Sequence, residues 1–355
     1  MNSKIEKIFD FSAAYAQEDG IWLLHAQFPF LFFYEYNSEK LTFMRRIPWE
    51  FTINKTNCIC MELVGNVLIL VPFQADSIIY YDIESDRFTK NRLNCITDGS
   101  SVNYGKCYVY GEWIYCIPVE NDRIAKINIE SREVEYIEFL YLFKEEKVIL
   151  SSSVRFMDTI ICTVINNSNM LEINLANDRV NLINVEKDYE VNFMESEIIK
   201  DRIWLYDNKN NTISEFDINN MKLSLQLVDL ESYMHLKAIS DEYIMINNPL
   251  SGDWRIYDDS FRMIIQGKKD DVWGKDFNNK IYRIVSSKGK RIIIAGGNII
   301  LYWKDSNLIL NNIRIDVNKV YKIIMKSYME ENKYLRESSI FNLDSLCDYI
   351  KDYKF

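Results

Sequence analysis

The sequence Tyr80-Tyr81-Asp82-Ile83-Glu84-Ser85-Asp86-Arg87-Phe88 is an apolar run that ends at a carboxylate, turns and resumes as a second strand. A close copy is Lys126-Ile127-Asn128-Ile129-Glu130-Ser131-Arg132-Glu133-Val134. Further copies occupy residues 33–41, 172–180, 215–223 and 256–261. A spacing of about 40 to 47 residues indicates a repeat architecture built from one supersecondary unit.

The residues before this phrase complete the repeat. Residues 57–62 form a short predicted strand, Gly65-Asn66 a turn, and residues 67–71 a nearly continuous apolar run. Such a run between turn signals predicts a strand buried on both faces. Pro72 is expected to end that strand, since proline cannot donate to a central ladder. Residues 77–83 and the more polar residues 87–93 then make four strands of decreasing burial.

The same order recurs along most of the chain. A turn-like pair precedes an apolar run in each repeat, at Gly65-Asn66, Gly111-Glu112, Met157-Asp158, Lys200-Asp201 and Asp241-Glu242. The marker residue of each repeat is Glu35, Asp82, Asn128, Asn174, Asp217, Asp258 and about Trp303. Seven four-stranded units without helices between them predict an all-β, seven-bladed β-propeller, because radial closure buries both faces of each sheet. Six blades is the alternative, if the last unit is only a cap.

The aromatic-Asp-x-x-Ser/Thr/Asn turns resemble those of kelch-like and NHL-like propeller proteins, over roughly residues 8–317. The paired glycines of kelch units and the Gly-His and Trp-Asp dipeptides of WD40 repeats are missing. The resemblance is therefore to propeller repeats in general and to no specific family. It implies that the innermost strands line a channel and that function lies at the channel mouth.

The repeat pattern ends near Val317, which predicts a propeller over 1–317 and a separate extension over 318–355. Residues 320–331 and 343–353 have helical spacing, and Asn342 is a possible N-cap. We expect a short C-terminal α-helical appendage that packs on the propeller. A helix pair that docks a partner is the alternative.

Composition narrows the classes of partner. The net charge of −10 argues against nucleic-acid binding, which needs clustered cations. No apolar stretch reaches the length of a membrane span, and the first residues lack the apolar core of a signal peptide. Seven cysteines without regular spacing fit a reducing compartment, so we expect a cytoplasmic monomer with no metal and no cofactor.

Counting from the turns places several polar residues where innermost strands begin. Asn57, Asn103 and Asn192 occupy equivalent positions, and Tyr233 lies at another. These amides, with the neighbouring Tyr104, could present donors and acceptors to a polar ligand. The alternative is that each asparagine closes its own turn by a local side-chain to backbone bond.

Two further groups of residues are candidates for ligand binding or catalysis. Arg45, Arg46 and Trp49 combine cations with an aromatic ring, as binding hot spots do, although Trp49 could equally fill space between blades. The weaker candidates for catalysis share no linear motif; they are His235, Glu62, Glu197 and Arg155.

We therefore expect a non-catalytic binding or scaffold propeller that recognises a peptide, protein or glycan-type ligand at the channel mouth. The absence of a recognisable catalytic motif favours this class. The alternative is a lyase, cyclase or hydrolase that works in the central channel. A weaker third hypothesis is an assembly protein that acts through its blade edges.

Overall fold

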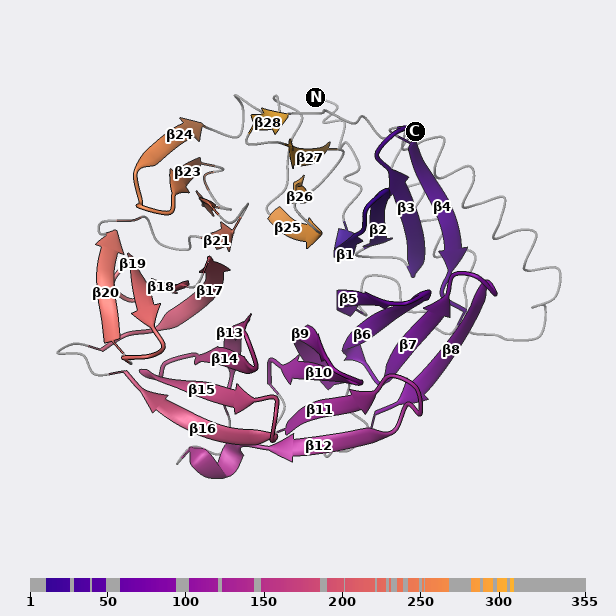
Figure 1. Ribbon diagram of the computed structural model, residues 1–355, viewed down its shortest axis with the longest axis horizontal. Helices are drawn as coiled ribbons and strands as arrows, with labels where there is room; N and C mark the ends of the chain where they lie inside the picture. Colours follow the sequence, from indigo (N-terminus) through magenta and orange to yellow (C-terminus); the bar gives the residue numbers. More distant parts are fainter. Residues whose placement is uncertain are drawn as a thin grey trace, which may run out of the picture. The chain divides into compact units, whose positions relative to one another are not determined.

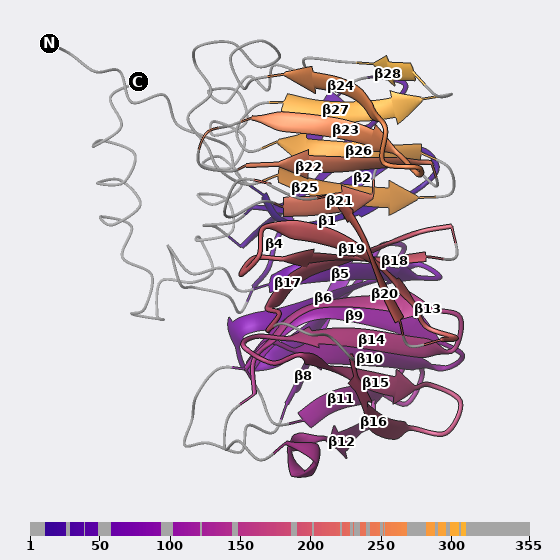
Figure 2. The same ribbon diagram turned by 90° about the vertical axis from the view of Figure 1, so that its left-hand side faces the viewer.

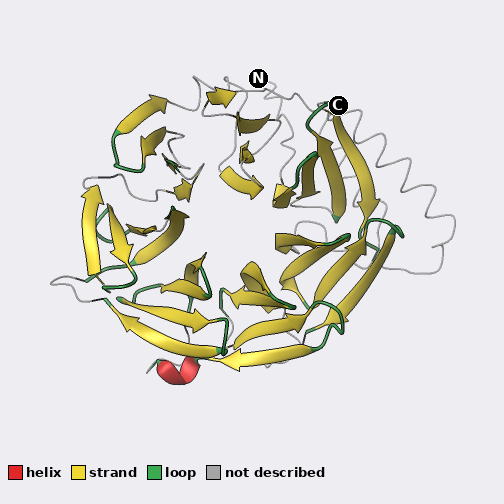
Figure 3. Cartoon of the chain, viewed as in Figure 1, coloured by secondary structure: helices red, strands yellow, loops and turns green. Residues whose placement is uncertain are grey.

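The chain folds almost entirely into β-strands. The computed structural model describes residues 11–25, 29–38, 40–48, 58–93, 102–120, 123–143, 148–185, 190–200, 202–220, 222–227, 230, 235–238, 242–248, 251, 253–267, 282–287, 290–295, 299–304 and 307–309. Within these ranges the one helical segment is a 3-10 turn, η1 (Leu140–Leu142), shown in Figure 3. The chain divides into two compact units, Met1–Asn57 with Lys275–Phe355, and Cys58–Gly274. The all-β prediction is confirmed for the described residues.

The unit Cys58–Gly274 contains five consecutive groups of four antiparallel strands. The first strands of the groups are β5 (Cys58–Val64), β9 (Val102–Tyr110), β13 (Leu150–Phe156), β17 (Phe193–Ile199) and β21 (His235–Ala238). The second strands are β6 (Val67–Ala75), β10 (Trp113–Pro118), β14 (Thr159–Val164), β18 (Arg202–Asp207) and β22 (Tyr243–Asn247). The third strands are β7 (Ser77–Asp82), β11 (Arg123–Asn128), β15 (Asn169–Asn174), β19 (Thr212–Asp217) and β23 (Trp254–Asp258). The fourth strands are β8 (Arg87–Arg92), β12 (Val134–Glu138), β16 (Arg179–Asn184), β20 (Lys222–Leu227) and β24 (Met263–Gly267).

Within this unit the first strands lie on the inner side and the fourth strands on the outer side (Figure 1). Neighbouring first strands contact one another, as β5 does β9 and β17 does β21. In the side view of Figure 2 the strands of successive groups run alongside one another. Sheets stacked in this radial manner are the blades of a β-propeller.

The repeated phrase is a hairpin turn between the third and fourth strands, as predicted. The Asp82 carboxylate accepts a hydrogen bond from the Ser85 backbone N–H, 2.8 Å away. Asn128, Asp217 and Asp258 make the equivalent bonds two or three residues ahead. These are Asx turns, in which a short side chain replaces a backbone acceptor. The marker residue therefore closes its own turn.

The turn between the first and second strands also repeats. Gly65 and Gly111 have φ of 58° and 57°, and Met157 and Lys200 stand at the equivalent positions with φ of 51° and 53°. Glycine takes this left-handed conformation without a steric cost, whereas a side chain there is strained. The turn geometry is thus the same in the repeats that have Met157 or Lys200 in place of the glycine.

Pro72 does not end the second strand of its group, contrary to the prediction. The strand β6 continues to Ala75, and Pro72 pairs with Cys58. Beyond Pro72, β6 leaves β5 and pairs with β9 through Phe73 and Asn103. A residue without an N–H is tolerated there because the ladder changes partner at that point.

The apolar cores lie between neighbouring sheets. Second strands are almost wholly buried, as in β10, while fourth strands such as β8 are largely exposed. One cluster joins Ile69 and Ile78 of one sheet to Cys107 and Ile114 of the next. Similar clusters fill the three following interfaces between sheets of this unit. Burial of apolar area between blades is the main stabilising term of such a fold.

The other unit contains the first and last sheets of the chain. The first sheet contains β1 (Phe11–Ala16), β2 (Gly20–His25), β3 (Phe30–Glu35) and β4 (Lys40–Arg46). The last sheet contains β25 (Tyr282–Ser287), β26 (Lys290–Ala295), β27 (Ile299–Lys304) and β28 (Asn307–Ile309). The strands β1 and β25 are in contact, although they lie far apart in the sequence.

The described residues thus hold seven four-stranded groups, two in one unit and five in the other. Seven as the number of blades stays a prediction, as does the domain boundary after residue 317. The predicted C-terminal helices, over 318–355, lie outside the described residues. No helix within the described ranges has the length and apolar character needed to cross a membrane.

Candidate functional site

Strand register aligns the inner residues of the five groups in the unit Cys58–Gly274. We define a first row as the residues that pair with the fifth position of each second strand: Cys60, Lys106, Ser152, Glu195 and His235. A second row pairs with the third position of each second strand and contains Glu62, Tyr108, Val154, Glu197 and Lys237. Both rows lie on one side of their strands, because residues two apart point the same way.

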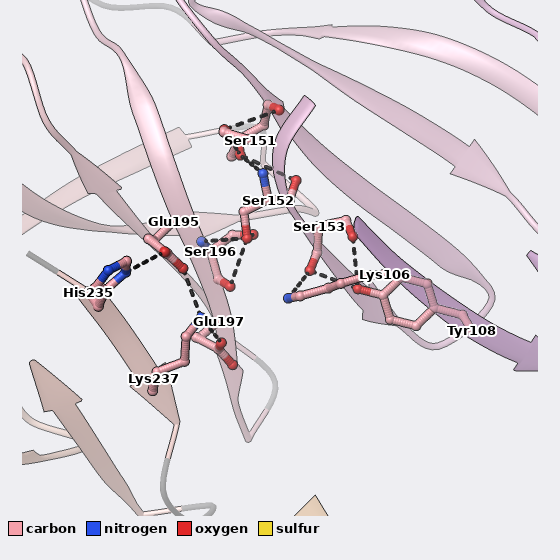
Figure 4. A network of polar contacts seen from close by, with 11 residues as sticks. Lys106, Tyr108, Ser151, Ser152, Ser153, Glu195, Ser196, Glu197, His235 and Lys237 are labelled. Atoms are coloured by element: carbon pink, nitrogen blue, oxygen red, sulfur yellow. Dashed lines mark hydrogen bonds and ion pairs between the residues drawn. The ribbon is translucent and has the colours of Figure 1, made fainter. Parts of the chain in front are cut away.

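Four residues of these rows form an ion cluster on β17 and β21. The Lys237 ammonium lies 2.8 Å from a Glu195 carboxylate oxygen and 3.2 Å from one of Glu197. The His235 Nδ1 lies 2.8 Å from the other Glu195 oxygen. Figure 4 shows the four side chains turned toward one another. The site is therefore a fixed arrangement of charges and not a set of independent surface groups.

Burial makes these contacts strong. The Lys237, Glu195 and Glu197 side chains are each less than one fifth exposed, at 19%, 18% and 19%. Burial alone would raise the pKa of Glu195, yet Lys237 and the hydrogen bond from His235 hold it at about 2. Burial would likewise lower the pKa of Lys237, but the two carboxylates raise it above its ordinary value. Glu195 and Lys237 are therefore both ionised at neutral pH.

His235 is oriented by this cluster. Because the Glu195 carboxylate can only accept, the neutral His235 ring carries its proton on Nδ1 and donates it to Glu195. Its Nε2 then holds a lone pair, and the side chain is 41% exposed. The ring can accept a hydrogen bond, or a proton, from a molecule in solution.

Hydroxyl groups on β9, β13 and β17 continue the polar surface. The Lys106 ammonium and the Tyr108 hydroxyl each donate to the Ser153 backbone carbonyl, both at 2.7 Å. The Ser152 and Ser196 hydroxyls lie 3.0 Å apart across neighbouring first strands. Burial lowers the pKa of Lys106, while the Glu197 charge opposes that shift. Figure 4 shows that this network lies beside the ion cluster.

The predicted asparagines fasten neighbouring blades. The Asn103 side-chain oxygen accepts from the Gln74 backbone N–H at 3.0 Å, and Asn192 does the same for Asn166 at 2.9 Å. Gln74 and Asn166 both have φ of 57°. Each amide therefore holds a left-handed backbone residue of the preceding blade, Gln74 within β6 and Asn166 in a turn, and does not close its own turn as the local alternative predicted. Asn57 lies outside the described residues.

The other predicted catalytic residues do not join the ion cluster. The Arg155 guanidinium donates to the carbonyl of Val109 and, at 2.9 Å, to that of Met157. Glu62 holds the second-row position equivalent to Glu197. No contact joins these two carboxyls within the described part of the chain.

The pKa of Glu62 moves in the opposite direction from that of Glu195. Burial raises the pKa of its carboxyl to about 7.

The remaining predicted ligand residues are dispersed. Tyr104 is 1% exposed and belongs to the apolar core between two sheets. Arg45 and Arg46 end β4 in the other unit, where Arg46 is buried and Arg45 exposed. Trp49 and Tyr233 lie outside the described residues. The ligand-binding role of all these residues stays a prediction.

Sequence reasoning identified His235 and Glu197 but missed Glu195, Lys237 and Lys106. The sequence did contain a signal for these residues, since charged residues stand at every second position. Glu195 and Glu197 share one side of a strand, and so do His235 and Lys237. What the sequence did not show is that the charged side chains of β17 and β21 meet. Among the described residues no three His, Cys, Asp or Glu side chains are arranged to hold a metal ion.

The sequence matches no protein-family model, and no curated protein matches it. Solved β-propellers match the structure. A streptogramin B lyase structure has a TM-score of 0.61 at 11% identity, over 86% of this chain and 97% of that one. YCF48 bound to D1 peptide has a TM-score of 0.62 at 12% identity, over 84% and 94%.

A third match is catalytically inactive virginiamycin B lyase from Staphylococcus aureus with quinupristin. Its TM-score is 0.57 at 9% identity, over 73% of this chain and 84% of that one. Identities this low show the fold alone, so this chain is a β-propeller of no specific family. Its structural neighbours include both enzymes and binding proteins.

Proposed function

We propose that this propeller is a binding module that holds a polar ligand, a peptide or a protein segment against its innermost strands. The observation that carries the proposal is the Glu195–Lys237–Glu197 arrangement, in which a cation is held between two carboxylates. Groups fixed in this way need no reordering when a ligand arrives, which lowers the entropic cost of binding.

The surrounding groups suit a polypeptide. His235 offers an acceptor, and the half-buried Ser152 adds a hydroxyl that the fully buried Ser196 holds in place. A peptide presents alternating N–H and C=O groups that such a surface can satisfy. YCF48, a propeller of similar fold, is bound to a peptide in its solved structure. A glycan-type ligand has comparable hydrogen-bonding groups and belongs to the same proposal.

We also propose where the protein is located, what kind of partner it binds and that it is a monomer. The five cysteines within the described residues are free thiols, which favours a reducing compartment such as the cytoplasm. The acidic charge favours a protein or peptide partner over a nucleic acid. We propose a monomer.

A random-peptide display library, panned against the purified protein, tests the binding proposal. We expect a shared sequence motif among the enriched peptides, and at least about tenfold weaker binding by His235→Ala and Glu197→Gln. Arg87→Ala, on the exposed outer strand β8, is the matched control and should bind as the wild type does. No enriched motif, or equal loss in all three variants, would count against the proposal.

A second function is favoured by one contact, the 2.8 Å hydrogen bond between Glu195 and His235. A carboxylate that orients a half-exposed imidazole is the arrangement of a general base, and the lyase or hydrolase alternative would use it. Quinupristin is a practical probe, since a lyase of similar fold has been solved with it. Conversion of quinupristin, followed by mass spectrometry, that is lost in His235→Ala and kept in Arg87→Ala would establish the enzyme.

A further inference from the structure

Two cysteine thiols meet between neighbouring innermost strands. Cys60 lies in β5 and Cys107 in β9, and their sulfur atoms are 2.9 Å apart. A disulfide bond is about 2.05 Å long, so bonding requires the sulfurs to approach by less than about 1 Å. The strands β5 and β9 are in contact, which keeps the two side chains near each other.

The two thiols have different surroundings. Cys60 is partly exposed, whereas Cys107 is 4% exposed. Burial, together with the hydrogen bond to Cys60, raises the pKa of the Cys107 thiol well above its ordinary value. Cys107 therefore stays protonated and shielded, and Cys60 is the sulfur that a dissolved oxidant can reach.

We propose that Cys60 and Cys107 form an oxidisable dithiol whose disulfide ties β5 to β9, a modification site for hydrogen peroxide. The Cys60 thiolate attacks one peroxide oxygen and breaks the O–O bond, which yields a sulfenic acid and hydroxide; the hydroxide takes up the thiol proton as water. The Cys107 sulfur then attacks the Cys60 sulfur and displaces the hydroxyl group, which leaves as a second water with the Cys107 proton. Two thiols and one peroxide thus give one disulfide and two waters.

The neighbouring carboxyl supports the first step. Glu62 is two residues from Cys60 on the same side of β5, and its charge acts on Cys107. Because burial raises its pKa to about 7, it can accept a thiol proton near neutral pH. The site is separate from the ion cluster on β17 and β21, so the proposal does not depend on the proposed binding function.

Peptide mapping of the full chain tests the cross-link. The protein is treated with hydrogen peroxide, alkylated and digested without reductant, and we expect a linked peptide pair containing Cys60 and Cys107. The thermal midpoint of the oxidised protein should rise by about 5 °C over the reduced protein, since the bridge restricts the unfolded chain. Cys60→Ser and Cys107→Ser should lose the linked pair and the rise.

Cys116→Ser is the matched control, because Cys116 is buried on β10 directly opposite Cys107. It should keep both the linked pair and the thermal shift. A pair that contains Cys116, or a cross-link between two chains, would overturn the proposal. So would unlinked cysteines in wild-type protein after oxidation.

The order of attack has its own test, which does not depend on the thermal stability of the variants. A dimedone probe should label Cys60 in peroxide-treated Cys107→Ser, because the sulfenic acid has lost the thiol that resolves it. Cys60→Ser should show at least about tenfold less label at Cys107. Equal labelling of the two variants would overturn the assignment of Cys60 as the attacking sulfur.

Discussion

Two pairs of neighbouring innermost strands, β5 with β9 and β17 with β21, hold different chemistry between them. On β5 and β9 the first-row residue Cys60 meets Cys107, which lies between the two rows, and Glu62 stands two residues from Cys60. On β17 and β21 the two rows bring together two carboxylates, a lysine and a histidine. Both pairs lie in the same unit and on the inner side of their sheets.

Glu62 and Glu195 show separately how burial and how neighbouring charges change the pKa of a carboxyl. Glu62 is buried without a cation among the causes of its shift, and its pKa rises to about 7. Glu195 is buried beside Lys237 and His235, and its pKa falls to about 2. Both carboxyls lie on the same side of an innermost strand, in adjacent rows, and the groups on the neighbouring strand set the direction in which each pKa moves.

Lys237→Met should have the largest effect on stability. It removes the cation between Glu195 and Glu197 and leaves two partly buried carboxylates facing each other. We expect a loss of about 2–4 kcal/mol in the free energy of unfolding, measured by urea denaturation at pH 7. Lys237→Arg keeps the charge and should lose much less. Equal losses in the two variants would show that the ion cluster does not stabilise the fold.

Glu195→Gln should cost less, about 1–3 kcal/mol at pH 7, because Glu197 still pairs with Lys237. Its pKa is about 2 in the folded chain and 4.5 ordinarily, so its contribution is present above pH 4.5 and is lost as the pH falls toward 2. Urea titrations at a series of pH values should show the difference from wild type shrinking over that window. A difference that stays constant would contradict the lowered pKa.

Glu62→Gln should change the free energy of unfolding in the opposite direction, toward higher stability at alkaline pH. The pKa of Glu62 is about 7 in the folded chain and 4.5 ordinarily, so the folded chain holds the proton more tightly than the unfolded chain does. This contribution to stability is fully present below pH 4.5 and is lost as the pH rises through 7. The variant should match wild type near pH 4 and be more stable by about 1–2 kcal/mol at pH 8. Urea denaturation at both pH values measures this. A variant less stable than wild type at pH 8 would contradict the raised pKa of Glu62 and with it the contrast with Glu195.

Asn103→Ala and Asn192→Ala should have the smallest effects. Each removes one hydrogen bond to the backbone of the preceding blade, at Gln74 and Asn166 respectively. We expect each to lose about 0.5–1 kcal/mol, measured by thermal or urea unfolding. Because the two hydrogen bonds are equivalent, similar losses are expected at the two interfaces between blades, β5–β8 with β9–β12 and β13–β16 with β17–β20. Losses that differ several-fold would mean that the repeat does not give the two amides the same role.

The fold could be predicted because its signals are local and repeated. The Asx turns at Asp82, Asn128 and Asp217 depend on residues within a few positions of one another. Apolar runs of five or six residues specify the buried second strands in the same way. Local signals that recur define the strand order and the class of fold, even where the turn glycine is replaced by Met157 or Lys200.

The candidate site was predicted in part. His235 and Glu197 were identified from their positions in the repeat, and the structure places both in the ion cluster. Asn103 and Asn192 were also placed correctly at the beginning of innermost strands. Their hydrogen bonds to the preceding blade were not predicted, since they join residues far apart in the chain.

The sequence by itself determined the repeat, the turns and the side of the strand on which each residue lies, because these depend on neighbours along the chain. The tertiary structure decided which strands face each other, and so whether a carboxyl meets a lysine, as Glu195 does, or lies among thiols, as Glu62 does. Charge state and reactivity follow from those contacts, since electrostatic and desolvation effects act through space.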